Sequence, residues 1–322
     1  MVSENLADDN PRPLDFTDCG RLSSGVGSGA LSGVPQDYQG SSFQLEFDTM
    51  TKGAIQLVDH CEDQYISTLF LVPKPVGFRP VFNLKFLNVF VIKIHFKMEG
   101  LPTALGLIQH KDFMASLDLR DAYFAIPVAE EFRHYLRFIW QGEVFQFVCV
   151  PFGLTSAPRI FTKITKPILA YLRARGTRMT MYLDDTLIMA SSREECVTQV
   201  HSTLRLFEDL GFVVNREKSV IRPVQTITYL GFVISSTDMQ VSLGPKKYLK
   251  IITRVQDLMN LKCPSIRSVS KVIGLLVSTF PAVIPGPMHY RQLEREKARA
   301  LHQVDNYNAP MTLSPFAKKE LC

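Results

Sequence analysis

The chain has 322 residues, of which 46% are hydrophobic and 21% are charged. These are ordinary values for a globular protein, and the length allows one large domain or two to three subdomains. No apolar run approaches the roughly 18 residues that a membrane helix requires, and the acidic N-terminus lacks the apolar core of a secretory signal. We therefore expect no membrane partner.

The cysteines and the charges indicate the cell compartment and the kind of partner. Six cysteines are scattered without a CxxC pair, which predicts reduced thiols in an intracellular protein of the cytoplasm or nucleus. The net charge is +5, but residues 1–50 hold two basic and eight acidic residues, leaving 34 basic and 23 acidic residues in 51–322. A basic body behind an acidic leader favours a polyanion partner, although a merely basic surface is the alternative.

The first half of the chain alternates between loops and strands. Residues 1–42 are Gly/Ser-rich and predict a disordered leader, and residues 43–58 have helical spacing of apolar side chains. Two apolar runs around Pro-Val-Gly within 68–88 predict a hairpin. A buried strand begins at Phe113, and residues 135–150 predict a second hairpin with its turn at Gln141-Gly142.

The second half adds helices. A helix follows Pro158 and ends at Gly176, with a kink expected at Pro167. Residues 178–192 predict a hairpin that carries two aspartates at or near its tip. Ser192-x-x-Glu195 resembles a capping box before a helix. A β-rich stretch over 212–235 precedes helices after Pro245, so the fold class is α+β followed by a helical subdomain.

Three aspartates stand among apolar neighbours. Asp118 ends the strand that begins at Phe113, and Asp184 and Asp185 lie between Met181-Tyr182-Leu183 and Thr186-Leu187-Ile188-Met189. Adjacent carboxylates between apolar strands are costly unless something compensates their charge. A solvent-facing tight turn is one interpretation. The other is a two-metal site, which needs carboxylates from different strands and binds hard cations such as magnesium.

Six motifs then occur in the order of a known family. MYLDDTLIM resembles the Tyr-x-Asp-Asp box of reverse transcriptases, and LDLRDAYFAIPV resembles their upstream aspartate box. VPFGLTSAPRIF, FLVPKPVGFRPVFNLKFLN, LGFVVNREKS and ITYLGFVIS resemble the Pro-x-Gly, fingertip, lysine and primer-grip boxes. The ordered set spans about residues 65–235. The resemblance implies a right-hand polymerase fold with fingers, an antiparallel palm sheet and a helical thumb.

The resemblance also implies a function and metal ligands. The expected activity is that of an RNA-directed DNA polymerase, a nucleotidyltransferase of a retrotransposon that adds dNTPs to a primer 3′-hydroxyl on an RNA or DNA template. Asp118, Asp184 and Asp185 are expected to be catalytic and to bind two Mg²⁺ ions, with Mn²⁺ as an alternative. Asp118 and Asp185 would bridge the metals, Asp184 would be peripheral, and the carbonyl of Leu119 would add a ligand.

Further residues are expected to contact the nucleotide or the primer. Lys74 and Arg79 would clamp the phosphates, since the Arg fork suits bidentate phosphate contacts. Tyr123 would exclude a 2′-hydroxyl, with a core aromatic as the alternative, and Lys218 would be a general acid or a solvated lysine. The remaining nucleotide-binding residues are Asp121, Ala122, Phe152 and Gly153, and the primer grip comprises Leu230, Gly231 and Phe232.

Some residues depart from the family pattern. Asn83 replaces the usual aspartate of the fingertip box. The turn from Lys74 to Arg79 lacks the common Asp-Gly, which puts the reach of Lys74 in doubt. Relatives of the LTR and hepadnaviral type also have phenylalanine at the position of Phe152, whereas retroviruses have glutamine there.

We expect fingers and palm over 43–235, a helical thumb or connection over 236–300, and a tail over 301–322 that leads towards a ribonuclease H domain absent from this chain. Residues 265–301 resemble tyrosine-recombinase retrotransposons of the DIRS type. Ribonuclease H and recombinase modules would then be encoded separately or lost. Basic residues of the helical end could track a template–primer backbone: Lys246, Lys247, Lys250, Arg254, Lys262, Arg267 and Lys271.

Two other functions fit the same residues. A catalytically silent or domesticated nucleic-acid-binding fragment would keep the fold and lose the chemistry. Another palm-type enzyme, such as an RNA-dependent RNA polymerase or a nucleotide cyclase, is disfavoured by Tyr123 and by the Pro-Phe-Gly box. Primer extension with dNTPs and rNTPs distinguishes the three.

Overall fold

The structure, a computed structural model, describes residues 53–73 and 78–321. The predicted leader over 1–42 lies outside the described residues. The chain divides into two compact units, one of Met1–Lys97 and Asp121–Pro167 and the other of Met98–Arg120 and Ile168–Cys322.

The first unit holds two small antiparallel sheets and short helices. One sheet has the order β1-β6-β5, and the other is the hairpin β2-β3. Its elements are β1 (Ile55–Leu57), β2 (Thr68–Pro73), β3 (Phe78–Asn83), α2 (Leu87–Phe90), η2 (Ala122–Ala125), η3 (Glu130–Tyr135), β5 (Arg137–Trp140), β6 (Glu143–Phe147) and the first part of α4 (Ala157–Ala174). Both predicted hairpins are confirmed, the second with Gln141-Gly142 at its turn.

The helix predicted over 43–58 is wrong at its C-terminal end. Ile55–Leu57 form strand β1, which pairs antiparallel with β6, and the rest of that segment lies outside the described residues. The spacing of apolar side chains favours a helix, but pairing with an available sheet edge overrides this weak local preference. Aromatic packing holds this unit together, because the rings of Phe82, Phe138 and Phe147 lie 5.1–5.6 Å apart between centroids.

The second unit contains the larger sheet. Its strands lie in the order β10-β4-β8-β7, with β9 paired to β4, and a second sheet has the order β11-β12-β13. The elements up to the second sheet are α3 (Leu101–Leu107), β4 (Phe113–Arg120), the end of α4, β7 (Arg178–Tyr182), β8 (Asp185–Ala190), α5 (Arg193–Asp209), β9 (Val213–Val214), β10 (Val220–Val224), β11 (Thr226–Tyr229), β12 (Phe232–Ser235) and β13 (Gln240–Leu243). The predicted strand, hairpin and β-rich stretch are thus confirmed.

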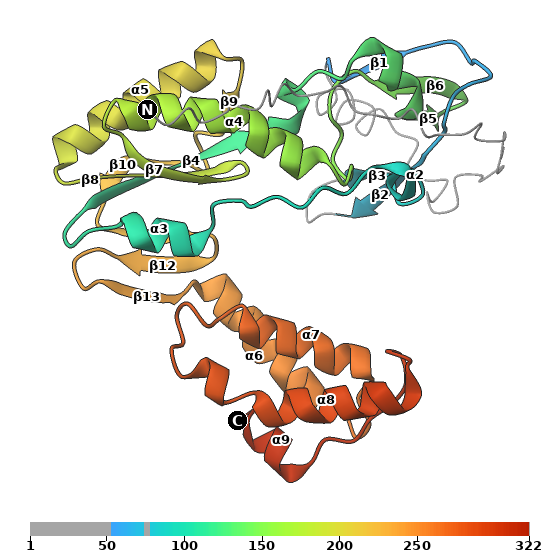
Figure 1. The fold of residues 1–322 in the computed structure, drawn as a ribbon, viewed down its shortest axis with the longest axis vertical. Coiled ribbons are helices and arrows are strands. Elements are labelled where there is room, and N and C mark those ends of the chain that lie inside the picture. The colour runs from blue at the N-terminus through green and yellow to red at the C-terminus, as the bar shows by residue number, and fades with distance from the viewer. Residues whose placement is uncertain (1–52, 74–77, 322) are drawn as a thin grey trace, which may run out of the picture. The chain divides into compact units, whose positions relative to one another are not determined.

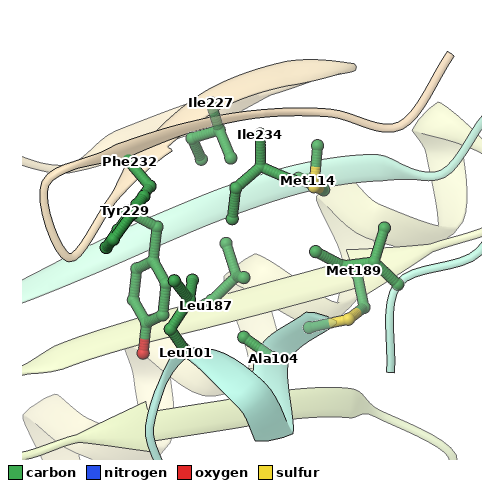
Figure 2. Packing of buried hydrophobic residues seen from close by; sticks show 10 residues of the cluster. Leu101, Ala104, Met114, Leu187, Met189, Ile227, Tyr229, Phe232 and Ile234 are labelled. Carbon is green, nitrogen blue, oxygen red and sulfur yellow. The ribbon is translucent and has the colours of Figure 1, made fainter. Parts of the chain in front are cut away.

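The larger sheet is covered on both faces. Helix α5 contacts β4, β8 and β10 on one face, and α3 and the β11-β12-β13 sheet lie on the other (Figure 1). Between the two sheets, buried side chains form one cluster (Figure 2): Leu101, Ala104, Ile108, Met114, Leu187, Met189, Ile227, Tyr229, Phe232 and Ile234. Burying both faces explains why β8 is apolar along nearly its whole length.

Helix ends follow the expected side-chain chemistry. Ser192 caps α5, since its Oγ accepts a hydrogen bond from the Glu195 N–H at 3.1 Å, and the Glu195 carboxylate accepts from Ser191. The capping-box prediction is confirmed in this form. Helix α4 ends before Gly176, which has a φ of 87°, and continues through Pro167. The kink expected at Pro167 stays a prediction.

The last part of the second unit is helical: α6 (Pro245–Met259), α7 (Ile266–Val277), η4 (Gly286–Met288), α8 (Arg291–Val304) and α9 (Pro315–Lys319). These helices share a core that includes Ile266, Val269 and Leu293. The boundary predicted between residues 300 and 301 falls within α8, and Met311 and Ala317 of the predicted tail are buried in the same core. Within the ranges 53–73 and 78–321, no helix has the length and hydropathy to cross a membrane.

Candidate active site

The strand register brings two of the three aspartates together. Asp118 in β4 pairs directly with Asp185, the first residue of β8, in an antiparallel ladder. Directly opposed residues project from the same face of a sheet with Cβ atoms about 4.5–5.5 Å apart, where like charges are destabilising. Alternation places both side chains on the face that carries Met114, Leu187 and Met189, at the end of the ladder. The register therefore creates a pair of like-charged carboxylates at one end of the two central strands of the sheet.

The third aspartate lies in the turn that joins β7 to β8. Leu183 and Asp184 form a two-residue connection, because Tyr182 pairs with Asp185. Leu183 has a φ of 53°, a left-handed conformation that costs a residue with a Cβ about 1–2 kcal/mol. The Leu119 N–H donates to the Asp184 carbonyl at 3.0 Å, which ties the turn to β4. Asp184 itself is exposed beside the pair.

The loop between β9 and β10 holds the backbone of Asp118. The Asp118 N–H donates to Ser219 Oγ at 3.0 Å, and the Asn215 N–H donates to the Asp118 carbonyl at 2.8 Å. Ser219 Oγ in turn donates to the Asn215 carbonyl at 2.7 Å. We call residues 215–219 the Asp118 clamp. Lys218 belongs to this clamp, is exposed, and lies close enough to lower the pKa of Asp184 and Asp185.

Burial and neighbouring negative charge raise the pKa of Asp184 and Asp185. Desolvation raises the pKa of Asp185 to about 6, the charges of Asp184 and Asp118 add to the effect, and Lys218 partly offsets it. Desolvation and the charge of Asp118 also raise the pKa of Asp184. Opposite charge within a few ångströms reverses such shifts, so a cation would relieve the repulsion.

This donor set fits a divalent metal that also takes substrate oxygens. Across the parts of the chain that the structure describes, no three His, Cys, Asp or Glu side chains form a ready-made metal cage. Magnesium is commonly held by one or two carboxylates plus substrate phosphates, so an opposed pair such as Asp118 and Asp185 suffices on the protein side. Leu119 is paired with Val214 in β9, and metal binding by its carbonyl stays a prediction.

The predicted primer-grip residues belong to the same unit. Leu230 and Gly231 form the turn between β11 and β12, and Phe232 is buried at the start of β12. Tyr229, which precedes the turn and which the sequence reading did not single out, donates from Oη to the Asp185 carbonyl at 3.2 Å. Burial, Asp185 and Glu99 raise the pKa of Tyr229, so its hydroxyl remains a donor. No local sequence pattern predicts this hydrogen bond, because Tyr229 and Asp185 are 44 positions apart.

The first unit groups other predicted residues around aromatic rings. Asp121 has a φ of 49° and begins η2, which contains Ala122 and Tyr123. The Tyr123 ring lies 5.1 Å from Phe152 and 5.5 Å from Phe161 between centroids. Tyr123 is half-buried and Phe152 is 41% exposed, so an aromatic surface remains open to a ligand.

Gly153 is held where only glycine fits easily. Its φ is 99°, and a Cβ there would lie 3.2 Å from the Phe82 carbonyl oxygen. Its own carbonyl accepts from Asn88 Nδ2 at 2.9 Å, and Asn88 Oδ1 accepts from the Thr155 N–H at 2.8 Å. Asn88, which the sequence reading did not assign, thus anchors the Phe152-Gly153 turn.

Of the two predicted phosphate-binding residues, the structure describes only the backbone of Arg79. Arg79 is in β3, paired with Val72, and Lys74 lies outside the described residues. Asn83 replaces the aspartate usual in the fingertip box, and its Oδ1 accepts from the Lys85 N–H at 3.2 Å. An aspartate would accept the same bond, so the amide preserves this turn.

The basic residues of the helical end differ in exposure and in their contacts with other residues of the chain. Lys246, Lys250, Lys262 and Lys271 are exposed. Lys247 Nζ instead lies 3.8 Å from the Phe232 ring centroid and donates to the Ser278 carbonyl at 2.8 Å. Arg267 donates to Asn308, and Arg254 forms a surface ion pair with Asp257.

Comparison with known proteins agrees with this architecture. The fold resembles that of the foamy viral protease-reverse transcriptase dRH in complex with ds DNA, with a TM-score of 0.69, 17% identity, and coverage of 89% of this chain and 47% of that one. The foamy viral protease-reverse transcriptase in complex with RNA/DNA hybrid gives a TM-score of 0.63 at 18% identity, over 89% and 36% of the chains. The fold is that of a right-hand polymerase.

Sequence comparison gives the family. Residues 72–234 match the family model of reverse transcriptase (RNA-dependent DNA polymerase), about half of the chain, and the chain belongs to this family. Similar relatives are the Transposon Tf2-3 polyprotein of Schizosaccharomyces pombe (29% identical over 52% of this chain and 12% of the relative) and the Retrovirus-related Pol polyprotein from transposon gypsy of Drosophila melanogaster (28% over 49% and 15%). The matched region is thus the reverse transcriptase domain of a retroelement. It spans about an eighth of the length of these polyproteins.

Proposed function

We propose that this chain is an RNA-directed DNA polymerase that extends a primer by two-metal nucleotidyl transfer. The observation that carries the proposal is the direct pairing of Asp118 with Asp185, with Asp184 in the adjoining turn. Bound divalent cations would activate the primer 3′-hydroxyl and neutralise charge on the departing pyrophosphate. Asp118 and Asp185 would hold them, and Asp184 would add local negative charge.

The remaining residues would bind and orient the reactants. Lys218 lies beside the carboxylates, where it could give a proton to pyrophosphate. Arg79 and Lys74 would contact the phosphates of a dNTP, and Asp121, Ala122, Phe152 and Gly153 would line its site. Tyr123 would lie against the deoxyribose and exclude a 2′-hydroxyl.

The proposed partner is an RNA or DNA template with its primer. Support comes from the basic body of the chain and from the structural relatives, which were solved with ds DNA and RNA/DNA hybrid. The exposed lysines of α6 and α7 and of the segment between them would contact phosphates without reading sequence.

Primer extension by the purified chain tests the proposal. We expect Mg²⁺-dependent incorporation of dNTPs on a primed RNA template, and a loss of roughly a thousandfold in Asp185→Asn, because one of the two carboxylates that would hold the cations is removed. Asp209→Asn is the matched control, because Asp209 is exposed at the end of α5. Template–primer binding without extension by the wild-type chain would favour a nucleic-acid-binding role alone.

We infer further that the parent element is of the DIRS type, from the resemblance of residues 265–301. The genomic sequence downstream of the codon for Cys322 tests this inference. An open frame for a tyrosine recombinase supports it, whereas an integrase of the kind found in gypsy-like elements contradicts it.

A further inference from the structure

Tyr229 connects the edge of the carboxylate site to a neighbouring hairpin. Its side chain is 3% exposed, and its Oη donates to the backbone carbonyl of Asp185 at 3.2 Å. Figure 2 shows its ring beside Leu101 and Leu187 within the buried cluster. The surrounding apolar side chains therefore hold the ring, and the hydrogen bond fixes where its polar end lies.

The turn that follows Tyr229 has a defined conformation. Tyr229 pairs with Phe232, so Leu230 and Gly231 form a two-residue connection, and their φ angles are 48° and 79°. Positive φ at both positions is the type I′ arrangement, whose twist matches that of the flanking strands. Movement of the turn relative to Tyr229 would therefore require the strand pairing to break.

The far side of the turn is held by the start of α6. The Gly244 N–H donates to the Gly231 carbonyl at 3.0 Å, and a Cβ at Gly244 would lie 2.9 Å from that oxygen. Lys247 adds a second contact, since its Nζ lies over the Phe232 ring and donates to Ser278. The hairpin thus has contacts on one side with β8 and on the other with α6.

We propose that Tyr229 is a positioning residue that fixes the Leu230-Gly231 turn relative to Asp185, and with it the primer 3′-hydroxyl relative to the catalytic carboxylates. This inference rests on the proposed function. The physical basis is that Tyr229 directly precedes the turn and its hydroxyl binds the backbone of Asp185. This hydrogen bond therefore sets the distance between the turn and Asp185. A displacement of about 1 Å between reacting groups can reduce a rate about a hundredfold.

Tyr229→Phe removes this hydroxyl and keeps the ring. We expect the single-nucleotide incorporation rate to fall about tenfold, while the Kd for template–primer stays within about twofold, because the phosphate contacts are unchanged. Tyr290→Phe is the matched control, since Tyr290 is also buried but belongs to the core of the helical end.

A readout other than activity separates this inference from the proposed function. A primer with 2-aminopurine at its 3′ end reports the environment of the terminus by fluorescence in the bound complex. We expect Tyr229→Phe, and not Tyr290→Phe, to change that fluorescence, even in Ca²⁺, where no extension is required. Mn²⁺ affinity measured by electron paramagnetic resonance should differ from the wild-type value by less than about threefold.

The outcomes are distinct. If the wild-type chain binds template–primer but does not extend it, the proposed function fails, and the fluorescence comparison still tests the role of Tyr229. Unchanged fluorescence and an incorporation rate within twofold of Tyr290→Phe would overturn the inference. Equal losses in both variants, together with equally lowered thermal stability, would also overturn it, because they indicate a general effect on folding.

Discussion

Asp185 combines a partly buried position with two like-charged neighbours. In the metal-free protein its pKa is about 6, compared with 3.8 for an unperturbed aspartate. The folded state therefore binds more protons than the unfolded state between about pH 4 and pH 6. As the pH rises from about 4 to 6, ionisation of Asp185 thus progressively lowers the free energy of unfolding. Above about pH 6 the whole of this destabilisation is present.

Asp185→Asn should accordingly stabilise the metal-free protein at pH 7.5. A shift of about 2 pKa units corresponds to at most about 3 kcal/mol, and partial solvent access reduces the expected gain to roughly 1–2 kcal/mol. Urea denaturation in EDTA at pH 7.5 and at pH 4 measures it. The gain in the free energy of unfolding should vanish at pH 4. At pH 7.5, Mg²⁺ in place of EDTA should reduce this gain. An equal gain at both pH values would show that repulsion is not its cause.

Tyr123 is the residue with the sharpest predicted effect on specificity. Its ring packs against Phe152 and Phe161, which holds it in one orientation beside Ala122. Tyr123→Ala should reduce discrimination against rNTPs by roughly 10- to 100-fold, as measured by the ratio of kcat/KM for dNTP and rNTP. Tyr171→Ala, at an exposed position of α4, is the control. Unaltered discrimination would assign Tyr123 to the aromatic core alone.

At the level of elements, the site depends on β4 and β8 and on the Asp118 clamp. The ladder aligns the carboxylates, and the clamp occupies both backbone polar groups of Asp118 through Ser219 and Asn215. The same loop carries Lys218, so one short segment holds the Asp118 backbone and brings a positive charge near Asp184 and Asp185. Ser219 and Asn215 hold the backbone of Asp118, whereas the proposed proton transfer to pyrophosphate belongs to Lys218 of the same loop.

Ser219→Ala tests the clamp. The substitution leaves the Asp118 N–H without its acceptor, so we expect a loss of about 1–2 kcal/mol in the free energy of unfolding and about tenfold in kcat. Ser219→Thr, which keeps the hydroxyl, should restore most of the activity. Ser202→Ala is the control, since Ser202 makes a comparable bond to Thr198 on an exposed face of α5. A stability loss without a change in kcat would make the clamp purely structural.

At the scale of the whole molecule, charge is distributed unevenly along the chain. The excess of basic residues lies after residue 50, and four exposed lysines lie on α6, α7 and the segment between them. Internal contacts already occupy Lys247 and Arg267. The exposed four are therefore the candidates for contacts with nucleic acid phosphates.

Lys250→Gln combined with Lys271→Gln should weaken binding of template–primer regardless of its sequence. If both lysines contact phosphates, the slope of log K against log salt should become shallower by roughly 2. Fluorescence anisotropy over 50–300 mM salt measures it. Lys111→Gln, before β4, is the control and should leave the slope unchanged. An unchanged slope in the double variant would place both lysines on a solvated helix face.

Local patterns in the amino-acid sequence were enough to predict most elements and the identity of the carboxylates. Apolar runs, the Ser192 cap and each of the six motifs depend on neighbours within a few positions, and such signals survive without tertiary context. The segment 43–58 shows the limit, because β1 forms only where β6 offers a strand edge.

The three aspartates can be identified from the sequence, but whether Asp118 and Asp185 lie on the same face of the sheet depends on the register of β4 and β8. A shift of one residue between β4 and β8 would place Asp118 and Asp185 on opposite faces. Burial of Met114, Leu187 and Met189 beneath α3 and the β11-β12-β13 sheet selects the observed register. The hydrogen bonds from Tyr229 to Asp185 and from Asp118 to Ser219 join residues 44 and 101 positions apart, so only the tertiary structure decides them.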